Sequence, residues 1–119
     1  MSNKDLVLPN FPAKEFMMGD KNVYDKMNEN FLIKLQVLRD RCGFPLVINS
    51  SYRTPEYNKS VGGSPGSYHI LGRAVDIKCL NSITRARIIK EALNMGLSCG
   101  IYKSWIHVDD RDVQLVYVG

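Results

Sequence analysis

Two histidines and one aspartate in this chain have the residue types of a metal site. The only histidines are His69 and His107, and Asp76 lies between them, closer to the first. Two imidazoles and one carboxylate suit zinc, and three protein ligands leave the fourth tetrahedral position for water. Zinc lowers the pKa of that water towards about 7 and polarises a carbonyl group, which is the chemistry of a hydrolase.

Strand alternation predicts that Asp76 and His107 point to the same side of a sheet. Segments 74–78 and 105–109 each alternate apolar and polar residues, as half-buried strands do. Four apolar residues would face the core: Val75, Ile77, Ile106 and Val108. Gly72 permits the sharp backbone path that would bring His69 back to the neighbouring strand. We therefore expect the three side chains to meet in a cleft.

Two other interpretations fit the same three residues. A histidine or aspartate on a strand is more often a hydrogen-bonded structural residue than a metal ligand. Two histidines and a carboxylate also form the facial triad of non-haem iron oxygenases. For that class we would expect the first histidine closer to the carboxylate, and a double-stranded barrel with more strands than this chain can supply.

The bulk composition is that of one compact domain spanning residues 1–119. The chain has 119 residues, of which 45% are hydrophobic and 24% are charged, a globular balance. The net charge of +4 favours anionic partners. The basic residues are scattered, without a run of five or more, so we expect neither nucleic acid nor membrane as a partner. The sequence makes no prediction of oligomeric state.

The cysteines and the first twenty residues indicate the cellular compartment of the protein. Cys42, Cys79 and Cys99 form no C-x-x-C pair, so we expect small buried hydrophobic residues, not a disulfide framework or a cysteine-rich zinc site. Residues 1–20 contain charges and two prolines where a signal peptide needs an apolar stretch. We therefore predict a cytoplasmic location.

Periodicity predicts an α+β domain. Apolar residues at helical spacing mark two helices, at 23–41 and 82–94, with Gly43 and Gly96 as stops. A short helix is also expected at 13–17, after Pro12 and before Gly19. Short β-type runs occur at 46–49, 74–78, 98–102, 105–109 and 113–118. We expect a small, mainly antiparallel sheet with helices packed on one face, and the last three strands as a meander. Residues 50–67 are predicted to form a long structured loop, of the kind that is usually functional.

The candidate ligands also lie in motifs that resemble a known family. The motifs are Ser67-x-His69-x-x-Gly72-x-Ala74-x-Asp76 and Trp105-x-His107-x-Asp109. They resemble the zinc D-alanyl-D-alanine carboxypeptidases, a family that includes vancomycin-resistance dipeptidases and many phage endolysins. Segments 50–54 and 58–63 resemble its smaller phage-type members, so the similarity runs from about residue 16 to 109. The resemblance implies the α+β fold shared with the hedgehog signalling domain.

The resemblance also implies roles for individual residues. His69, Asp76 and His107 would be the zinc ligands. Arg53 matches a family arginine near the substrate, where its planar fork can hold a carboxylate by two hydrogen bonds. Ser67 matches a position beside the metal that can bond substrate. Both of these also have a structural alternative, because Arg53 can pin a loop and Ser67 can brace a turn.

One position departs from the family pattern. Relatives commonly place Glu or Asp three residues before the last zinc-binding histidine, as the general base, and here that residue is Ser104. Asp109 is our candidate for the catalytic base because alternation places it on the face of His107. A role in orienting an imidazole suits it equally. Asp110 is the remaining nearby candidate.

Two functional hypotheses follow. The first is a zinc metallopeptidase that cleaves peptidoglycan stem peptide, as a D-Ala-D-Ala carboxypeptidase or an L-Ala-D-Glu endopeptidase, and so degrades cell wall. The second is a catalytically inactive, zinc-stabilised binding or structural module, such as a virion component, in which Ser104 marks a lost base. Either would suit a phage protein kept in the host cytoplasm until lysis, or carried in the virion, although a bacterial enzyme is also compatible.

Overall fold

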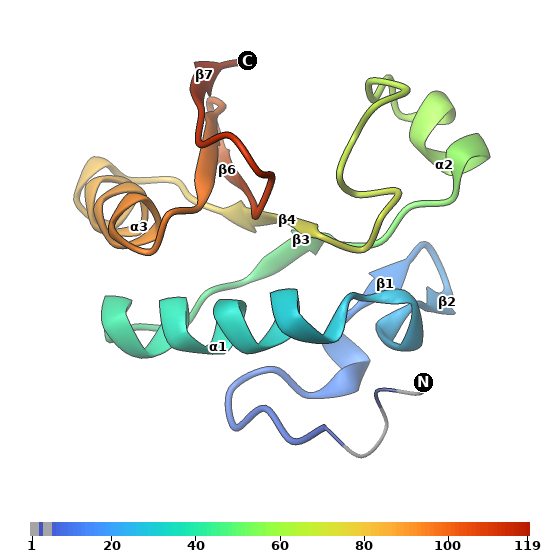
Figure 1. Cartoon of the computed structure of the whole chain (residues 1–119), viewed down its shortest axis with the longest axis horizontal. Coiled ribbons are helices and arrows are strands. Elements are labelled where there is room, and N and C mark those ends of the chain that lie inside the picture. Colours follow the sequence, from blue (N-terminus) through green and yellow to red (C-terminus); the bar gives the residue numbers. More distant parts are fainter. Residues whose placement is uncertain (1–2, 4–5) are drawn as a thin grey trace.

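The protein is built around a five-stranded sheet, as the computed structural model of the chain shows for residues 3 and 6–119 (Figure 1). The strand order is β3-β4-β6-β5-β7. The strands are β3 (Ile48–Ser50), β4 (Ala74–Lys78), β5 (Ser98–Ile101), β6 (Trp105–Asp109) and β7 (Val116–Val118). All neighbours are antiparallel except β5 and β7, which are parallel. This architecture confirms the predicted α+β class.

Two long helices cover the apolar face of the sheet. They are α1 (Glu29–Cys42), which lies beneath the sheet in Figure 1, and α3 (Ser82–Asn94). Asn28 and Asn81 cap them by accepting hydrogen bonds from backbone N–H groups of the first turn. The four strand residues predicted to face the core are fully buried: Val75, Ile77, Ile106 and Val108. None of the helices in the described part of the chain is long and apolar enough to cross a membrane.

The N-terminal elements are shorter than predicted. The helix expected at 13–17 is a single 3-10 turn, Ala13–Glu15, followed by a two-stranded ribbon of β1 (Met17–Met18) and β2 (Lys21–Asn22). The helix expected from residue 23 begins only at Glu29, after a separate 3-10 turn, Tyr24–Lys26. The apolar spacing continued across this break because the residues before it are buried in the same core as α1.

Two further expectations about the chain path were wrong. The loop predicted at 50–67 contains α2 (Pro55–Ser60), which Thr54 caps and Pro55 opens, a combination typical of helix starts. The last three strands are not a meander, because β7 pairs with β5 in parallel and not with β6. Both edges of β6 are already occupied by β4 and β5, so β7 cannot pair with β6, and it adds at the free edge of β5.

The three cysteines are free and buried, as expected of small core residues. Burial raises the pKa of Cys42 to about 11 and that of Cys99 to about 12. Both of these thiols therefore stay protonated at neutral pH and are poor metal ligands.

Gly72 holds the segment that follows His69 against the start of α1. Its φ is +68°, and its carbonyl accepts a hydrogen bond of 2.9 Å from the backbone N–H of Asn28. A Cβ at this position would lie 2.3 Å from the carbonyl oxygen of Lys26. The turn therefore needs glycine both for its conformation and for the close approach of two backbones.

We predict that Gly72→Ala destabilises the protein by about 2–5 kcal/mol, combining left-handed strain with a backbone clash. Gly43→Ala is the matched control, because Gly43 has a φ of +76° but nothing within 4 Å of its added Cβ. Gly43→Ala should lower the free energy of unfolding by only about 1–2 kcal/mol. Urea unfolding measures both free energies, and equal losses would contradict the close packing at Gly72.

Candidate metal centre

Strand register places one row of residues across the sheet. Ser50 pairs with Asp76, Asp76 with His107, His107 with Gly100, and Gly100 with Tyr117. Residues directly opposite one another on neighbouring strands point to the same face of a sheet. The row therefore carries a carboxylate, an imidazole and a phenol side by side on the face away from α1 and α3.

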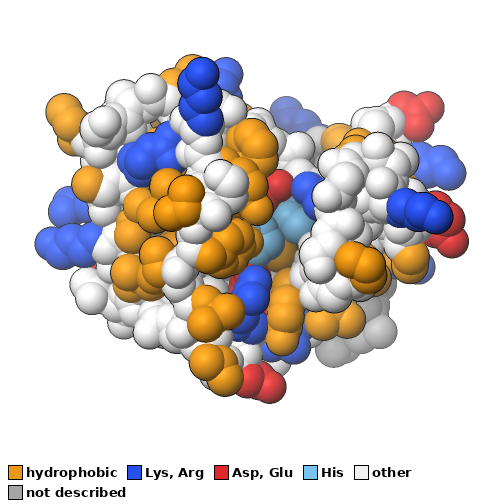
Figure 2. All heavy atoms as spheres, turned by 90° about the horizontal axis from the view of Figure 1, so that it is seen from above, with side chains coloured by type: hydrophobic (Ala, Val, Ile, Leu, Met, Phe, Trp, Pro, Cys, Tyr) orange, Lys and Arg blue, Asp and Glu red, His pale blue; other side chains and the backbone are white. Residues whose placement is uncertain are grey.

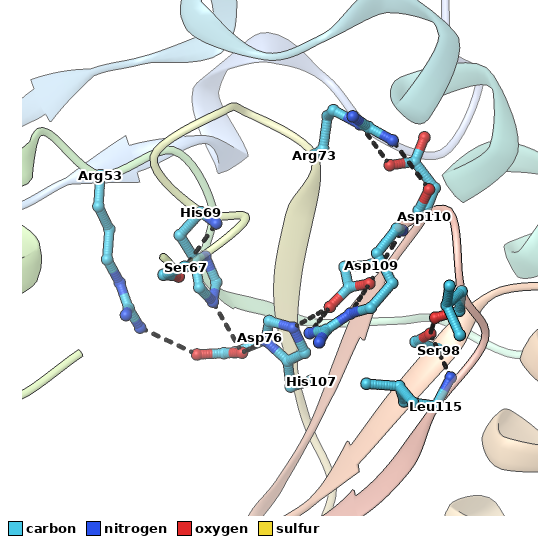
Figure 3. Close-up of polar contacts among 12 residues, drawn as sticks. Arg53, Ser67, His69, Arg73, Asp76, Ser98, His107, Asp109, Asp110 and Leu115 are labelled. Atoms are coloured by element: carbon cyan, nitrogen blue, oxygen red, sulfur yellow. Dashed lines mark hydrogen bonds and ion pairs between the residues drawn. The ribbon is translucent and has the colours of Figure 1, made fainter. Parts of the chain in front are cut away.

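The three candidate ligands converge at this row (Figure 3). His69 Nε2 and His107 Nδ1 each lie 3.1 Å from Asp76 Oδ1. The three potential ligand atoms all lie within 4.8 Å of one another. All three residues are buried, and two of them come from strands, whereas His69 comes from the turn that Gly72 closes. The structure thus brings the three residues together as the sequence predicted.

The outer nitrogen of each imidazole has an acceptor beside it. His69 Nδ1 lies 2.7 Å from the carbonyl oxygen of Ser51, and His107 Nε2 lies 2.7 Å from Asp109 Oδ2. A carbonyl or carboxylate oxygen can only accept, so these nitrogens carry the hydrogen atoms. The inward nitrogens, His69 Nε2 and His107 Nδ1, contact Asp76, and a metal would take the place of the protons in these contacts, so that the lone pairs of both nitrogens would point to it. The donor set therefore fits zinc.

Buried hydrogen bonds fix the ionisation of this centre. Burial alone would raise the pKa of Asp76, but hydrogen bonds to His107 and His69 outweigh it and hold that pKa well below its usual range. Burial alone would lower the pKa of His107, but hydrogen bonds to Asp109 and Asp76 outweigh it and raise that pKa. Asp76 is therefore an ionised, buried carboxylate whose charge is balanced by the groups around it.

Arg53 contacts the candidate ligand directly. Its Nη2 donates to Asp76 Oδ2 at 3.1 Å, its Nε donates to Ser50 Oγ, and its Nη1 donates to Asn58 Oδ1 on α2. Its side chain is 14% exposed and lines the cleft above the sheet. Arg53 therefore braces α2 against the site and also presents an edge to whatever occupies the cleft.

Ser67 lies in the turn before His69. Its Oγ accepts a hydrogen bond of 3.1 Å from the backbone N–H of His69, which braces this turn. Ser67 also lines the cleft, so bracing leaves its hydroxyl near the space where a substrate would lie.

The aspartate that ends β6, Asp109, and the next residue, Asp110, contact different partners. Asp109 is fully buried behind His107, and its carboxylate also accepts hydrogen bonds from Arg111. Burial alone would raise the pKa of Asp109, but the hydrogen bonds to Arg111 and His107 hold it well below its usual range. Asp110 instead binds Arg73 at 2.7 Å and Lys34 at 3.2 Å. In Figure 3 it lies on the side of Asp109 away from His107.

A cleft of about 530 Å³ opens above the row. Figure 2 shows the histidines at the bottom of this hollow, between two walls. One wall is the segment 61–68, and the other contains three aromatic residues, one arginine and one leucine: Tyr102, Trp105, Tyr117, Arg111 and Leu115. Of the residues that the structure describes, Asp76 is the one carboxylate in the lining. Ser104 is outside the lining, and its carbonyl accepts a hydrogen bond from Cys79 N.

Sequence reasoning missed Tyr117 and Arg111 as cleft residues. The Tyr117 ring centroid lies 6.0 Å from that of His107, and its ring covers Gly100, where a Cβ would lie 2.4 Å from Tyr117 Cζ. Burial and a hydrogen bond with Tyr102 raise the pKa of Tyr117, so its hydroxyl stays protonated at neutral pH. The glycine opposite His107 was the available signal, but using it required the pairing of β5 with β7.

Comparison with known proteins agrees with this site. Residues 10–109 match the family described as Peptidase M15, a range that contains all three candidate ligands. No individually curated protein matches the chain. The family match covers most of the chain and confirms the resemblance that the motifs indicated. The chain belongs to the peptidase M15 family of zinc-dependent, D-alanyl-D-alanine carboxypeptidase-like metallopeptidases.

Proposed function

We propose that this protein is a zinc-dependent hydrolase that cleaves peptide bonds in peptidoglycan stem peptides. The observation that carries this proposal is the pair of imidazoles, each with its outer N–H engaged, that converge with Asp76 at the floor of an open cleft. A carboxypeptidase that releases D-alanine and an endopeptidase that cuts between L-alanine and D-glutamate both suit this arrangement.

The proposed ligands are His69, Asp76 and His107. Zinc held by three protein ligands supplies an activated water and polarises the scissile carbonyl. The chain's own contribution is orientation, because Ser51 and Asp109 fix the two rings and Arg53 fixes the second oxygen of Asp76. Preorganised ligands of this kind lose little freedom on binding metal or substrate.

Other cleft residues act on the substrate. Arg53 holds a substrate carboxylate through the N–H groups that its own partners leave unused. The Tyr117 hydroxyl, held protonated beside His107, can accept a hydrogen bond from a substrate N–H group. Ser67 can add a hydrogen bond from the facing wall. Asp109, fully buried, acts through His107 as a positioning residue, one of the two roles that the sequence left open for it.

A second candidate function is a zinc-stabilised binding or structural module without catalysis. It is favoured by the cleft lining, which among the described residues has no carboxylate other than the proposed ligand Asp76. A general base contributes typically about 10² to 10⁴ in rate. The two functions therefore differ in turnover, not in metal binding.

The setting of this activity is also a proposal. The segments 50–54 and 58–63 resemble small phage-type enzymes, and the net charge of +4 favours an anionic cell wall. We place the protein in the host cytoplasm, from which lysis releases it, or in the virion.

Incubation of the zinc-loaded protein with peptidoglycan fragments tests the proposed function. Mass spectrometry should show either loss of D-alanine or a cut between L-alanine and D-glutamate. Products should disappear on adding a chelator and return with excess zinc. Intact fragments after prolonged incubation with zinc-loaded protein would favour the binding module.

We predict about one zinc per chain, as expected for a site with three protein ligands. His69→Ala, Asp76→Ala and His107→Ala should each lose most of the metal, because each removes one ligand atom. Elemental analysis of the folded proteins measures this, and Asp110→Asn serves as the control because Asp110 binds Arg73 and Lys34 instead. Unchanged metal content in all three variants would show that the site lies elsewhere.

We predict that Asp109→Asn weakens zinc binding by about 10- to 100-fold, because the amide no longer polarises His107 and leaves Arg111 without its ion pair. Competition with a chromophoric chelator gives the affinity. Asp110→Asn should keep wild-type affinity while lowering stability. If Asp109→Asn instead keeps full affinity but loses turnover, Asp109 is the base.

We predict that Arg53→Lys lowers kcat/KM for carboxylate-bearing peptides about 10-fold, because lysine keeps the charge but loses the planar fork. Zinc should be retained. The matched comparison is a peptide with an amidated C-terminus, for which the variant and the wild type should differ little. Wild-type kinetics on both peptides would leave Arg53 with the bracing role alone.

A further inference from the structure

The guanidinium of Arg111 is held by three residues at the wall of the cleft. Its Nε donates to Asp109 Oδ1 at 2.9 Å and its Nη2 donates to Asp109 Oδ2. Two aromatic rings lie close to it as well, since its Cζ lies 5.2 Å from the Tyr68 ring centroid and 5.7 Å from that of Tyr117. These contacts fix the group without using all of its hydrogen-bonding capacity.

One edge of the Arg111 guanidinium is left for another molecule. The contacts to Asp109 use Nε and Nη2, and no described residue pairs with Nη1. The side chain is 23% exposed and lines the cleft. A guanidinium that is already immobilised loses little entropy when it binds a planar anion. The open edge is therefore suited to a carboxylate.

The charges around the centre favour a second anion. Asp76 balances Arg53, and Asp109 balances Arg111, so the charge of a divalent metal would be uncompensated by the cleft. Figure 3 shows Arg53 and Asp109 on opposite sides of Asp76 and His107. The two arginines thus approach the centre from opposite sides, and a single substrate carboxylate would satisfy only one of them.

We propose that Arg111 binds a second substrate carboxylate, on the opposite side of the metal centre from the one held by Arg53. This inference rests on the proposed function and narrows its substrate class. The substrate is a peptide with a C-terminal carboxylate at Arg53 and an acidic side chain, on the other side of the scissile bond, at Arg111. Tyr68 and Tyr117 contribute indirectly to the selection of this acidic side chain, because they hold the open edge of the Arg111 guanidinium towards the cleft.

Two peptides that differ in one group test this pairing. They are the stem pentapeptide L-Ala-D-γ-Glu-meso-diaminopimelate-D-Ala-D-Ala and the same peptide amidated at the side-chain carboxyl of diaminopimelate. Binding to zinc-loaded protein is read by stopped-flow fluorescence of Trp105, the one tryptophan of the chain, which lines the cleft. Mass spectrometry then reports cleavage of the same samples.

Wild-type protein should bind the acid form about 10-fold more tightly than the amide, as one charge-assisted hydrogen bond implies. Arg111→Gln should bind both forms alike, and Arg111→Lys should keep part of the preference. The two peptides are compared within each variant, so a general effect of losing the Arg111–Asp109 contact changes both affinities equally and cancels in their ratio. Arg73→Gln is the control, because Arg73 also lies over Tyr68, at 5.2 Å, but binds Asp110 and is outside the cleft lining. It should keep the full preference.

The outcomes separate this inference from the proposed function. An Arg111-dependent preference without cleavage upholds the second carboxylate position and overturns the peptidase activity. Cleavage with equal binding of acid and amide, or a preference that survives in Arg111→Gln, overturns the inference alone. Failure of both peptides to bind overturns both.

Discussion

The site depends on one buried carboxylate, that of Asp76. Its Oδ1 lies between the two imidazoles and its Oδ2 accepts from Arg53. A buried charge is costly unless it is paired and hydrogen-bonded, so each of these partners has to be held in place. That requirement explains why β6 lies beside β4, why the turn at Gly72 returns His69 to the sheet, and why α2 supplies Asn58 to hold Arg53.

A second buried carboxylate extends this arrangement behind the centre. Asp109 neutralises Arg111 and fixes the His107 ring, so two carboxylate and arginine pairs enclose the imidazoles. Gly100 completes the row, because the absence of a side chain beside His107 lets Tyr117 lie over β5. The polar side chains of the row therefore come from four strands of the sheet, β3, β4, β6 and β7, and their positions depend on the register of the sheet.

The sequence predicted the part of this site that local patterns encode. Alternation in 74–78 and 105–109 identified the shared face of Asp76 and His107, and Gly72 identified the turn that returns His69. Tyr117 was missed because its place depends on β7 joining β5 in parallel, a non-local pairing that the short β-type run at 113–118 does not reveal. Arg111 was missed because its contact with Asp109, two residues earlier, lies past the end of the alternating strand. The helix α2 was missed for a different reason, since its Thr54-Pro55 start stood within a stretch rich in Ser, Pro and Gly.

The geometry of the ligands separates the two proposed functions more clearly than the missing base does. A structural zinc site is usually closed by four protein ligands, whereas a catalytic site has three and an open position. Here His69, Asp76 and His107 are the group of potential ligands found in the described chain, and they lie at the floor of a cleft lined by arginines and tyrosines. A module that used zinc only for stability would gain nothing from keeping that fourth side open. The absence of a second carboxylate from the cleft lining, among the described residues, therefore bears on how the proton is transferred, and the open cleft supports a centre that acts on a bound peptide.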